Sequence, residues 1–467
     1  MTELRPYQQT IVDGARNAFR SGLRTALIQL PTGGGKTVLG SFMVQGSSNR
    51  GLCCWWLVHR RELLNQASKT FHEIGIEHGF ISGGRSSDPR QRVQIGSVQT
   101  VARRLDRLPP PDLIVFDEAH HLGAAQWQAI FDAYPDAKVV GLTATPWRLD
   151  GKGLGNWFET MIQGPAVAEL MEQGSLSRYR LFAPSTPDTS SVATQMGDFK
   201  ARDLSTVMDK PSITGDAVQH YRSLAHGRRA VAFACSIEHS QHVVDQFNQS
   251  GITAEHVDGQ MDHGQRDAII ARFVAGQTLV LSNADLLGEG FDVPAIEAAI
   301  LLRPTQSLSL HLQQVGRALR PSPGKSEAIL LDHAGNSLRH GLPDDDREWT
   351  LADREKRKKK AGDENEISVR QCTKCFRVYR PAPACPGCGY APPTAGRGVE
   401  EKEGVLAEVD PAVIRAARKR EERQAGSIEE LIQIGIKRGY KNPAGWARNY
   451  FGAREGARSR FGYGARA

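Results

Sequence analysis

The sequence lacks a long apolar segment. Its longest strongly apolar run covers residues 51–58, which is too short to cross a bilayer as a helix. The first ten residues, MTELRPYQQT, contain no apolar core of the kind that a secretory signal needs. We therefore expect a soluble, cytoplasmic protein with no membrane partner.

Cysteine is scarce, with seven residues in 467. No evenly spaced disulfide framework runs through the chain, which favours a reducing compartment. Cys53, Cys54 and Cys235 lie in apolar runs and are expected to be buried as small hydrophobic side chains. The other four cysteines form a cluster near residue 380, which needs an explanation of its own.

A strong compositional bias is also absent, because 40% of the residues are hydrophobic and 24% are charged, as in ordinary globular proteins. The charge is nevertheless uneven. From residue 351 onward there are 25 Lys and Arg against 15 Asp and Glu, whereas residues 1–350 carry 34 against 37. A basic appendage on a near-neutral body indicates a polyanionic partner such as nucleic acid, and a merely solvated tail is the alternative.

Short apolar runs recur at intervals that leave room for a helix, which is typical of parallel strands with crossover connections. One set lies within residues 25–144 and a second within residues 230–332, with a less regular stretch between them. The length and this pattern predict two tandem parallel-sheet α/β domains, a small cysteine module and a short helical basic tail. The predicted boundaries are 1–165 and 212–343 for the two domains, 166–211 for a connecting segment, 344–368 for a charged linker, 369–392 for the cysteine module and 405–467 for the tail.

Residues 30–37, LPTGGGKT, follow an apolar strand and precede an apolar helical stretch, which is the context of a phosphate-binding loop. Glycines let backbone N–H groups converge on phosphate oxygens, and the helix N-terminus adds positive charge. Lys36 would reach the β- and γ-phosphates, while Thr37 would hold Mg²⁺. Leu30 stands where the common pattern has its first glycine, so a plain turn is the alternative. The residues expected at the nucleotide phosphates are Thr32, Gly33, Gly34, Gly35, Lys36 and Thr37.

Residues 113–120, LIVFDEAH, end an apolar strand with two adjacent carboxylates. The carboxyl ends of strands in an open α/β sheet are where ligands bind. Asp117 is expected to anchor the Mg²⁺ shell, and Glu118 is expected to orient and deprotonate the water that attacks the γ-phosphate. A simple helix cap is the alternative for the pair.

Taken together, PTGGGKT, DEAH, LTATP (142–146) and QQVGRALR (313–320) resemble the motif set of superfamily 2 helicases and translocases. The resemblance is strongest to the branch of restriction-enzyme motor subunits, excision-repair translocases and phage helicases, and it covers residues 4–335. It implies two RecA-like domains with ATP between them. The implied activity is nucleic-acid-stimulated ATP hydrolysis that drives stepping along a strand.

The resemblance also assigns nucleotide-reading roles. Gln8 would hydrogen-bond adenine and Arg5 would stack on its ring, with a plain helix start as the alternative for residues 4–8. In the second domain, Gly290 and Asp292 resemble the segment that touches the ribose and senses the nucleotide. In the family, certain residues couple the ATP site to the nucleic-acid groove. His120, Thr143 and Thr145 resemble these coupling residues.

Arg317 and Arg320 resemble the finger residues that reach across the cleft to the γ-phosphate, with Gln313 nearby. They are three residues apart, so both can point at one ligand if the segment is helical. Their guanidinium groups would stabilise the charge on the transferring phosphoryl group only when the second domain closes. Hydrolysis would therefore depend on domain closure. Surface salt bridges are the alternative role for these arginines.

Residues 58–63 and 96–100 follow strands and correspond to nucleic-acid-contacting motifs of the family. Arg60, Ser97 and Thr100 could hold phosphates without reading bases, so binding would tolerate many sequences. The restriction and repair resemblance favours DNA over RNA. No nuclease or methyltransferase constellation stands out, so restriction or repair chemistry would require a partner protein.

Four cysteines form two CxxC pairs separated by nine residues. Each pair can aim two thiolates at one point, and four sulfurs match tetrahedral Zn²⁺. An iron–sulfur cluster and a redox dithiol are the alternatives. The ligands are Cys372, Cys375, Cys385 and Cys388.

The sequence thus predicts an ATP- and Mg²⁺-dependent DNA helicase or translocase with a zinc-stabilised basic accessory region. One rival is a duplex translocase that does not separate strands. Another is a noncatalytic nucleic-acid-binding scaffold. Intact motif residues argue against the scaffold, while polarity, pathway and oligomeric state stay undetermined.

Overall fold

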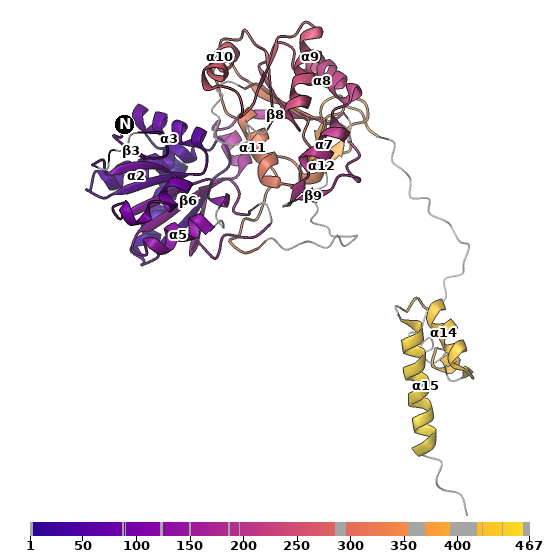
Figure 1. Ribbon diagram of the computed structural model, residues 1–467. Coiled ribbons are helices and arrows are strands. Elements are labelled where there is room, and N and C mark those ends of the chain that lie inside the picture. The colour runs from indigo at the N-terminus through magenta and orange to yellow at the C-terminus, as the bar shows by residue number, and fades with distance from the viewer. Residues whose placement is uncertain are drawn as a thin grey trace, which may run out of the picture. The chain divides into compact units, whose positions relative to one another are not determined.

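A computed structural model divides the chain into two units, residues 1–392 and 393–467, shown in Figure 1. Within the described part of the chain, no helix combines the length and the apolar character needed to cross a bilayer. The structure describes residues 3–85, 88, 90–121, 125–148, 151–184, 187–195, 197–284, 296–353, 369–392, 418–422, 424–440 and 442–460.

The first lobe is built on a seven-stranded sheet in the order β3-β4-β2-β5-β6-β1-β7. Every pairing in it is parallel, so its strands are joined by crossovers, many of them helical. The apolar runs recognised in the sequence become strands buried on both faces, as parallel sheets require. The elements are α1 Pro6–Arg20, β1 Thr25–Gln29, α2 Lys36–Ser48, β2 Cys54–Val58, α3 Arg61–Glu73, β3 Gly79–Ile81, β4 Val93–Ser97, α4 Val98–Ala102, η1 Leu105–Arg107, β5 Leu113–Asp117, η2 Ala119–His121, α5 Ala125–Ala133, β6 Lys138–Thr143 and β7 Thr160–Gln163.

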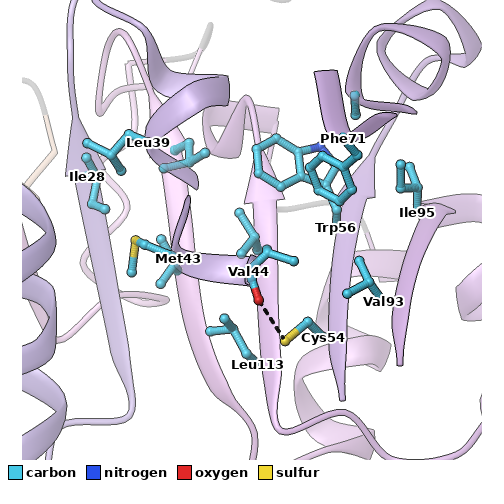
Figure 2. Packing of buried hydrophobic residues seen from close by; sticks show 14 of the residues in the cluster. Ile28, Leu39, Met43, Val44, Cys54, Trp56, Phe71, Val93, Ile95 and Leu113 are labelled. Carbon is cyan, nitrogen blue, oxygen red and sulfur yellow. Dashed lines mark hydrogen bonds between the residues drawn. The ribbon is translucent and has the colours of Figure 1, made fainter. Parts of the chain in front are cut away.

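One face of this sheet packs against α2 and α3, as Figure 2 shows. Trp56 is fully buried there and meets Phe71 edge to face, with ring centroids 5.4 Å apart. Cys54 lies in the same core, where its thiol donates to the Val44 carbonyl at 3.8 Å, and burial raises its pKa to about 12. The prediction of a buried cysteine is confirmed for Cys54 and Cys235, whereas Cys53 is only half-buried.

The second lobe is built on a six-stranded parallel sheet in the order β12-β13-β11-β14-β15-β8. The predicted fold class of two parallel α/β lobes is therefore confirmed. Apolar clusters cover both faces of this sheet as well. The elements are α6 Val167–Glu172, β8 Arg178–Phe182, β9 Thr194–Gln195, β10 Asp198–Phe199, α7 Ala201–Met208, α8 Pro211–Leu224, β11 Ala230–Ala234, α9 Ile237–Gln249, β12 Ala254–Val257, α10 His263–Val274, β13 Val280–Ala284, β14 Ala298–Leu301, α11 Leu308–Ala318, β15 Glu327–Asp332 and α12 Asn336–His340.

Strand β8 departs from the sequence expectation, which placed it in a connecting segment at 166–211. It pairs in parallel with β15 and forms one edge of the second sheet. Its sequence RYRLF buries only Leu181 and Phe182, because an edge strand has fewer neighbours to cover it. The short, half-polar run therefore gave no strand signal.

Part of the predicted charged linker, 344–368, is packed rather than solvated. Residues 344–353, which we call the strap, run from the second lobe onto the first. Trp349 packs against Trp147 at a tilted angle, with ring centroids 4.9 Å apart, and the Leu351 carbonyl accepts from Gly155 N–H at 2.8 Å. Leu351 packs against the core of the first lobe. Because charged residues surround Trp349 and Leu351, the local sequence does not indicate that these two apolar anchors are packed. Residues 354–368 lie outside the described part.

The cysteine module packs on the free edge of β8. Phe182 bridges Arg377 in antiparallel fashion, and Ala183 N–H donates to the Phe376 carbonyl at 3.0 Å. Arg380 pairs with Asp344 at 3.1 Å, and Val378 joins the core of the second lobe. The module thus covers an otherwise unpaired strand edge. Its strands are β16 Arg370–Gln371 and β17 Val378–Tyr379.

The second unit contains α14, Ile428–Lys437, and α15, Pro443–Arg460, which pack on each other. Ser427 caps α14 by accepting from Glu430 N–H at 3.2 Å, and the Glu430 carboxylate accepts from Gly426 N–H at 2.7 Å. Trp446 and Tyr450 pack against the core of this hairpin. The hairpin therefore has a small apolar core of its own.

Candidate functional site

The phosphate loop lies between β1 and α2. Gly33 and Gly35 have φ values of +87° and +84°, a left-handed conformation that side chains with a Cβ disfavour. Gly35 is also the N-cap of α2, so the helix begins directly at Lys36 and its free N–H groups face the loop. Lys36 donates to the Leu30 carbonyl at 3.3 Å.

The N-terminal segment packs on this loop. Gln8 is 4% exposed, and its amide lies 3.5 Å and 3.4 Å from the carbonyls of Gly34 and Gly35. Tyr7 donates to the Gly34 carbonyl at 2.9 Å and accepts from Arg5 at 3.1 Å. Arg5 and Gln8 are thus beside the phosphate loop, and Tyr7 is an additional contact that the sequence did not single out.

The two carboxylates end β5, close to the loop. Asp117 is buried, and its carboxylate accepts from Glu118 N–H at 3.1 Å. Burial, and then the charge of Glu118, raise the pKa of Asp117 to about 7, while the Lys36 ammonium opposes the shift. Glu118 has φ +51°, which is strained for a residue with a side chain. Strain of this kind is concentrated at functional sites.

His120 connects these acids to the end of β6. Its Nδ1 lies 3.4 Å from Glu118 Oε2 and 3.2 Å from Thr143 Oγ1. The Thr143 hydroxyl donates to the Thr145 carbonyl at 2.7 Å and accepts from Thr145 N–H at 3.2 Å. Because the single hydroxyl proton of Thr143 is used, His120 must carry its proton on Nδ1 in this network.

Helix α11 of the second lobe lies against the phosphate loop, on the side of that lobe facing the first (Figure 1). A Cβ on Gly316 would come within 2.6 Å of Thr32 Cβ, and one on Gly33 would come within 3.5 Å of Arg320 Cγ. Arg317 is 7% exposed, so this side chain is not directed at bulk solvent. The structure therefore brings the arginine segment of one lobe to the glycine loop of the other.

The buried Gln313 lies on the same helix, and its Nε2 has no hydrogen-bond partner. The C-terminal end of α11 is held by Lys325, whose ammonium donates to the carbonyls of Ala318 and Arg320. Burial lowers the pKa of Lys325 to about 8. A lysine near a helix C-terminus complements its free carbonyls. Sequence reasoning missed Lys325, because a lysine in a Pro- and Gly-containing loop carries no distinctive signal.

The residues predicted to contact nucleic acid lie at the ends of adjacent strands, since Val58 and Ser97 are register partners. Arg60 precedes α3 and is exposed. Ser97 caps α4 by accepting from Thr100 N–H at 3.3 Å, and its own hydroxyl donates to Thr100 Oγ1 at 3.0 Å. These two hydroxyls thus have structural partners within the loop. Gly290 and Asp292, the residues predicted to sense the nucleotide, lie outside the described residues.

The four clustered cysteines converge on one point, with all sulfur atoms within 4.8 Å of one another. Cys372 and Cys388 have their sulfurs 3.6 Å apart, as do Cys375 and Cys385. Disulfides need about 2.05 Å, whereas Zn–S bonds of about 2.3 Å in a tetrahedron place sulfurs about 3.8 Å apart. The cluster thus fits a tetrahedral thiolate-bound metal.

A glycine loop at the end of one parallel sheet, with acids beside it and an arginine helix from a second sheet against it, defines a two-lobed nucleotide-dependent motor. Comparison with known families agrees. Residues 1–148 match the family model described as type III restriction enzyme, res subunit, and residues 213–322 match the helicase conserved C-terminal domain. The chain belongs to the superfamily 2 helicases, an ATP-dependent family that acts on nucleic acid.

Individual relatives extend over both lobes. A 51.5 kDa protein of a Lactococcus phage is 36% identical over 76% of this chain and 75% of its own length. A Saccharomyces cerevisiae protein provisionally named ATP-dependent helicase IRC3 is 30% identical over 72% of this chain, but this covers only 52% of its length. A Vibrio vulnificus fragment, provisionally assigned as the HsdR subunit of a type I restriction enzyme, superposes with a TM-score of 0.59 at 20% identity, covering 73% of this chain and 66% of that one.

Proposed function

We propose that the protein is a DNA translocase that hydrolyses ATP at the seam between its two lobes and separates strands as it steps. The contact of α11 with the phosphate loop carries this proposal, because Gly316 and Thr32 are too close to admit even a methyl group between them. An arginine helix held this close can reach a phosphate bound in the loop. The restriction-enzyme names of the matching family and structure support DNA as the track.

At the first lobe, the backbone of Gly33 to Gly35 and the Lys36 ammonium would hold the phosphates. Thr37 and Asp117 would hold Mg²⁺, which when bound neutralises charge on the phosphate oxygens. Glu118 would accept the proton of the attacking water, and His120 Nδ1 lies 3.4 Å from its carboxylate. Arg5 and Gln8 would face the adenine. For this, Gln8 would give up its hydrogen bonds to the carbonyls of Gly34 and Gly35 and form hydrogen bonds to the base instead.

At the second lobe, Arg317 and Arg320 would stabilise the charge that develops on the γ-phosphoryl group. Gln313 has an unpartnered amide nitrogen in the buried seam, and a buried donor without a partner costs about 1–3 kcal/mol. A bound phosphate or the attacking water would satisfy it. Gly290 and Asp292 would sense the nucleotide from the same lobe.

The nucleic-acid track would cross the loops after β2 and β4, with Arg60 as an exposed phosphate contact. Ser97 and Thr100 would contribute through the loop conformation that they fix. His120, Thr143 and Thr145 would couple this surface to hydrolysis. Since these contacts do not reach base edges, binding would be sequence-tolerant and salt-dependent.

The test is ATP turnover with single-stranded DNA, duplex DNA, forked DNA and RNA, for the wild-type protein and Lys36→Ala. We expect DNA to stimulate turnover more than RNA does, and Lys36→Ala to abolish it. Strand displacement on forked DNA would then separate unwinding from duplex translocation without unwinding. Equal stimulation by RNA would overturn the choice of DNA, and no stimulation by any nucleic acid would overturn the motor.

We also propose that Cys372, Cys375, Cys385 and Cys388 bind Zn²⁺ as a structural ion. The sulfur separations support it, and the module has a core of only Cys372, Tyr379 and Cys385. Such a segment needs a metal to fold. Metal analysis of purified protein should give about one zinc per chain; iron in its place would point to an iron–sulfur cluster.

A further inference from the structure

One buried hydrogen bond joins the two lobes directly. The Thr145 hydroxyl donates to Ser309 Oγ at 2.8 Å, and the two residues are 2% and 8% exposed. Thr145 follows β6 of the first lobe, and Ser309 is the second residue of α11 in the second lobe. Water has little access to either hydroxyl, so each depends on the other lobe for its partner.

On the first-lobe side, this bond continues a chain that begins at the acids. Glu118 contacts His120, His120 contacts Thr143, and Thr143 exchanges two hydrogen bonds with the backbone of Thr145. A shift of Glu118 during hydrolysis therefore bears on Thr145 through groups that are all buried or nearly so. The chain ends at Ser309.

On the second-lobe side, Ser309 shares one face of α11 with the seam residues. Gln313, Gly316 and Arg317 follow it by four, seven and eight positions, a spacing that places side chains on one face of a helix. Gly316 contacts Thr32 near the other end of the helix. The helix is therefore held against the first lobe at two points, and these fix its rotation and its position along the seam.

We propose that Ser309 is a positioning residue that sets the register of α11 on the first lobe, and so aligns Arg317 with the phosphate loop. It acts through Thr145 and not by touching the nucleotide. This inference rests on the proposed function, and it adds a seam contact that couples the state of Glu118 to the arginine helix. Its loss would misalign Arg317 in the transition state and leave the first-lobe loop intact.

The test is a pair of substitutions measured alone and together. Ser309→Ala and Thr145→Val each remove one partner at nearly constant volume, and each should lower DNA-stimulated kcat about 5- to 10-fold, as expected for one buried hydrogen bond. The KM for ATP should change by less than about twofold. The double variant should be no slower than either single variant, since the two residues share one interaction.

Two further variants separate positioning from folding. Ser309→Thr keeps the hydroxyl and should recover most of kcat. Ser307→Ala removes the N-cap hydrogen bond of the same helix, in which Ser307 accepts from Leu310 N–H at 3.2 Å, and should lower the unfolding temperature without the same loss of kcat.

Additive losses in the double variant, or wild-type kcat in Ser309→Ala, would overturn the inference. So would a Ser309→Thr variant as slow as Ser309→Ala. If Ser309→Ala does not fold, Thr145→Val and Ser309→Thr still decide the question. An inactive wild-type protein would instead refute the proposed function, so the two failures are distinguishable.

Discussion

The two lobes have the same architecture but position their parts of the site differently. In the first lobe, the functional groups stand at strand ends and bond to one another, as Asp117 does to Glu118 N–H and His120 does to Thr143. In the second lobe, they stand on α11, whose ends are held by the Ser307 cap and by Lys325. The first lobe's part of the site is therefore organised by contacts within that lobe. The second lobe's part depends on where α11 is placed.

This difference suggests a division of labour. Under the proposed function, a loop whose shape is set by Gly33 and Gly35 would bind phosphates with or without the second lobe. Arginines on α11 would contribute only when that helix lies against the loop, so their effect would fall on the chemical step. Binding and hydrolysis should thus be separable by mutation, lobe by lobe.

The largest expected effect tests this separation. Arg317→Ala should lower kcat about 10³-fold, the range for an arginine that stabilises phosphoryl transfer, with ATP affinity almost unchanged. Lys36→Ala should weaken both ATP binding and hydrolysis. Fluorescent ATP titration together with turnover measurements checks both, and Arg16→Ala on the surface of α1 is the matched control. Equal loss of binding in the two variants would remove the distinction between the lobes.

A smaller effect concerns how each lobe is stabilised. Cys375→Ser, or zinc chelation, should destabilise the second lobe by about 3–5 kcal/mol, as for loss of a structural metal, because the module covers the edge of β8. Residues 158–348 contain no tryptophan, so tryptophan fluorescence is blind to that lobe. Circular dichroism should therefore show an early transition that fluorescence misses. Cys53→Ser, outside the cluster, should leave both signals unchanged, and coincident transitions in Cys375→Ser would mean that the lobes unfold as one.

Low pH should also destabilise the folded protein through the second lobe. His333 is fully buried beside His220, with ring centroids 5.2 Å apart, and burial lowers its pKa to about 3. Below pH 6.5 the unfolded chain binds a proton that folded His333 does not. Stability should therefore fall by about 1.4 kcal/mol per pH unit as the pH drops from 6.5 towards 3.

The checks are urea unfolding followed by circular dichroism at pH 7 and pH 5.5. His333→Phe should flatten the slope, while substitution of the exposed His226 by Gln should not. The same slope in His333→Phe as in the wild-type protein would assign the acid sensitivity to other groups. His311 is a further buried histidine of this lobe whose pKa is lowered by burial, and it would be examined next.

The sequence predicted which residues of the first lobe lie together at the strand ends, because each motif directly follows its strand. Residues 30–37 and 113–120 each combine an apolar strand with the functional side chains that follow it. The pattern specifies both the position and the residue type. Long buried strands also made the two-lobe architecture readable from periodicity.

The contacts between lobes could not be predicted in the same way. Ser309 and Trp349 act through Thr145 and Trp147, partners far away in sequence, and nothing in their neighbours identifies those partners. In sequence, the strap has the composition of a charged linker, because its two apolar anchors are surrounded by charge. β8 gave no signal because an edge strand needs little apolar surface. Tertiary pairing, rather than local pattern, decides all of these.

The strap provides the smallest and most specific test of the comparison. It joins the second lobe near Asp344 to the first near Gly155. The strap should therefore favour the closed arrangement, in which α11 lies against the phosphate loop. Trp349→Ala removes the contact with Trp147, worth about 1 kcal/mol for an aromatic pair. If ATP binding is coupled to closure, its apparent affinity should fall about fivefold, with kcat at saturation almost unchanged. Trp157→Phe, a conservative change within the first lobe, controls for the loss of a tryptophan. Unchanged ATP affinity in Trp349→Ala would mean that the strap only connects the lobes, and that the position of α11 is set by its own contacts with Thr32 and Thr145.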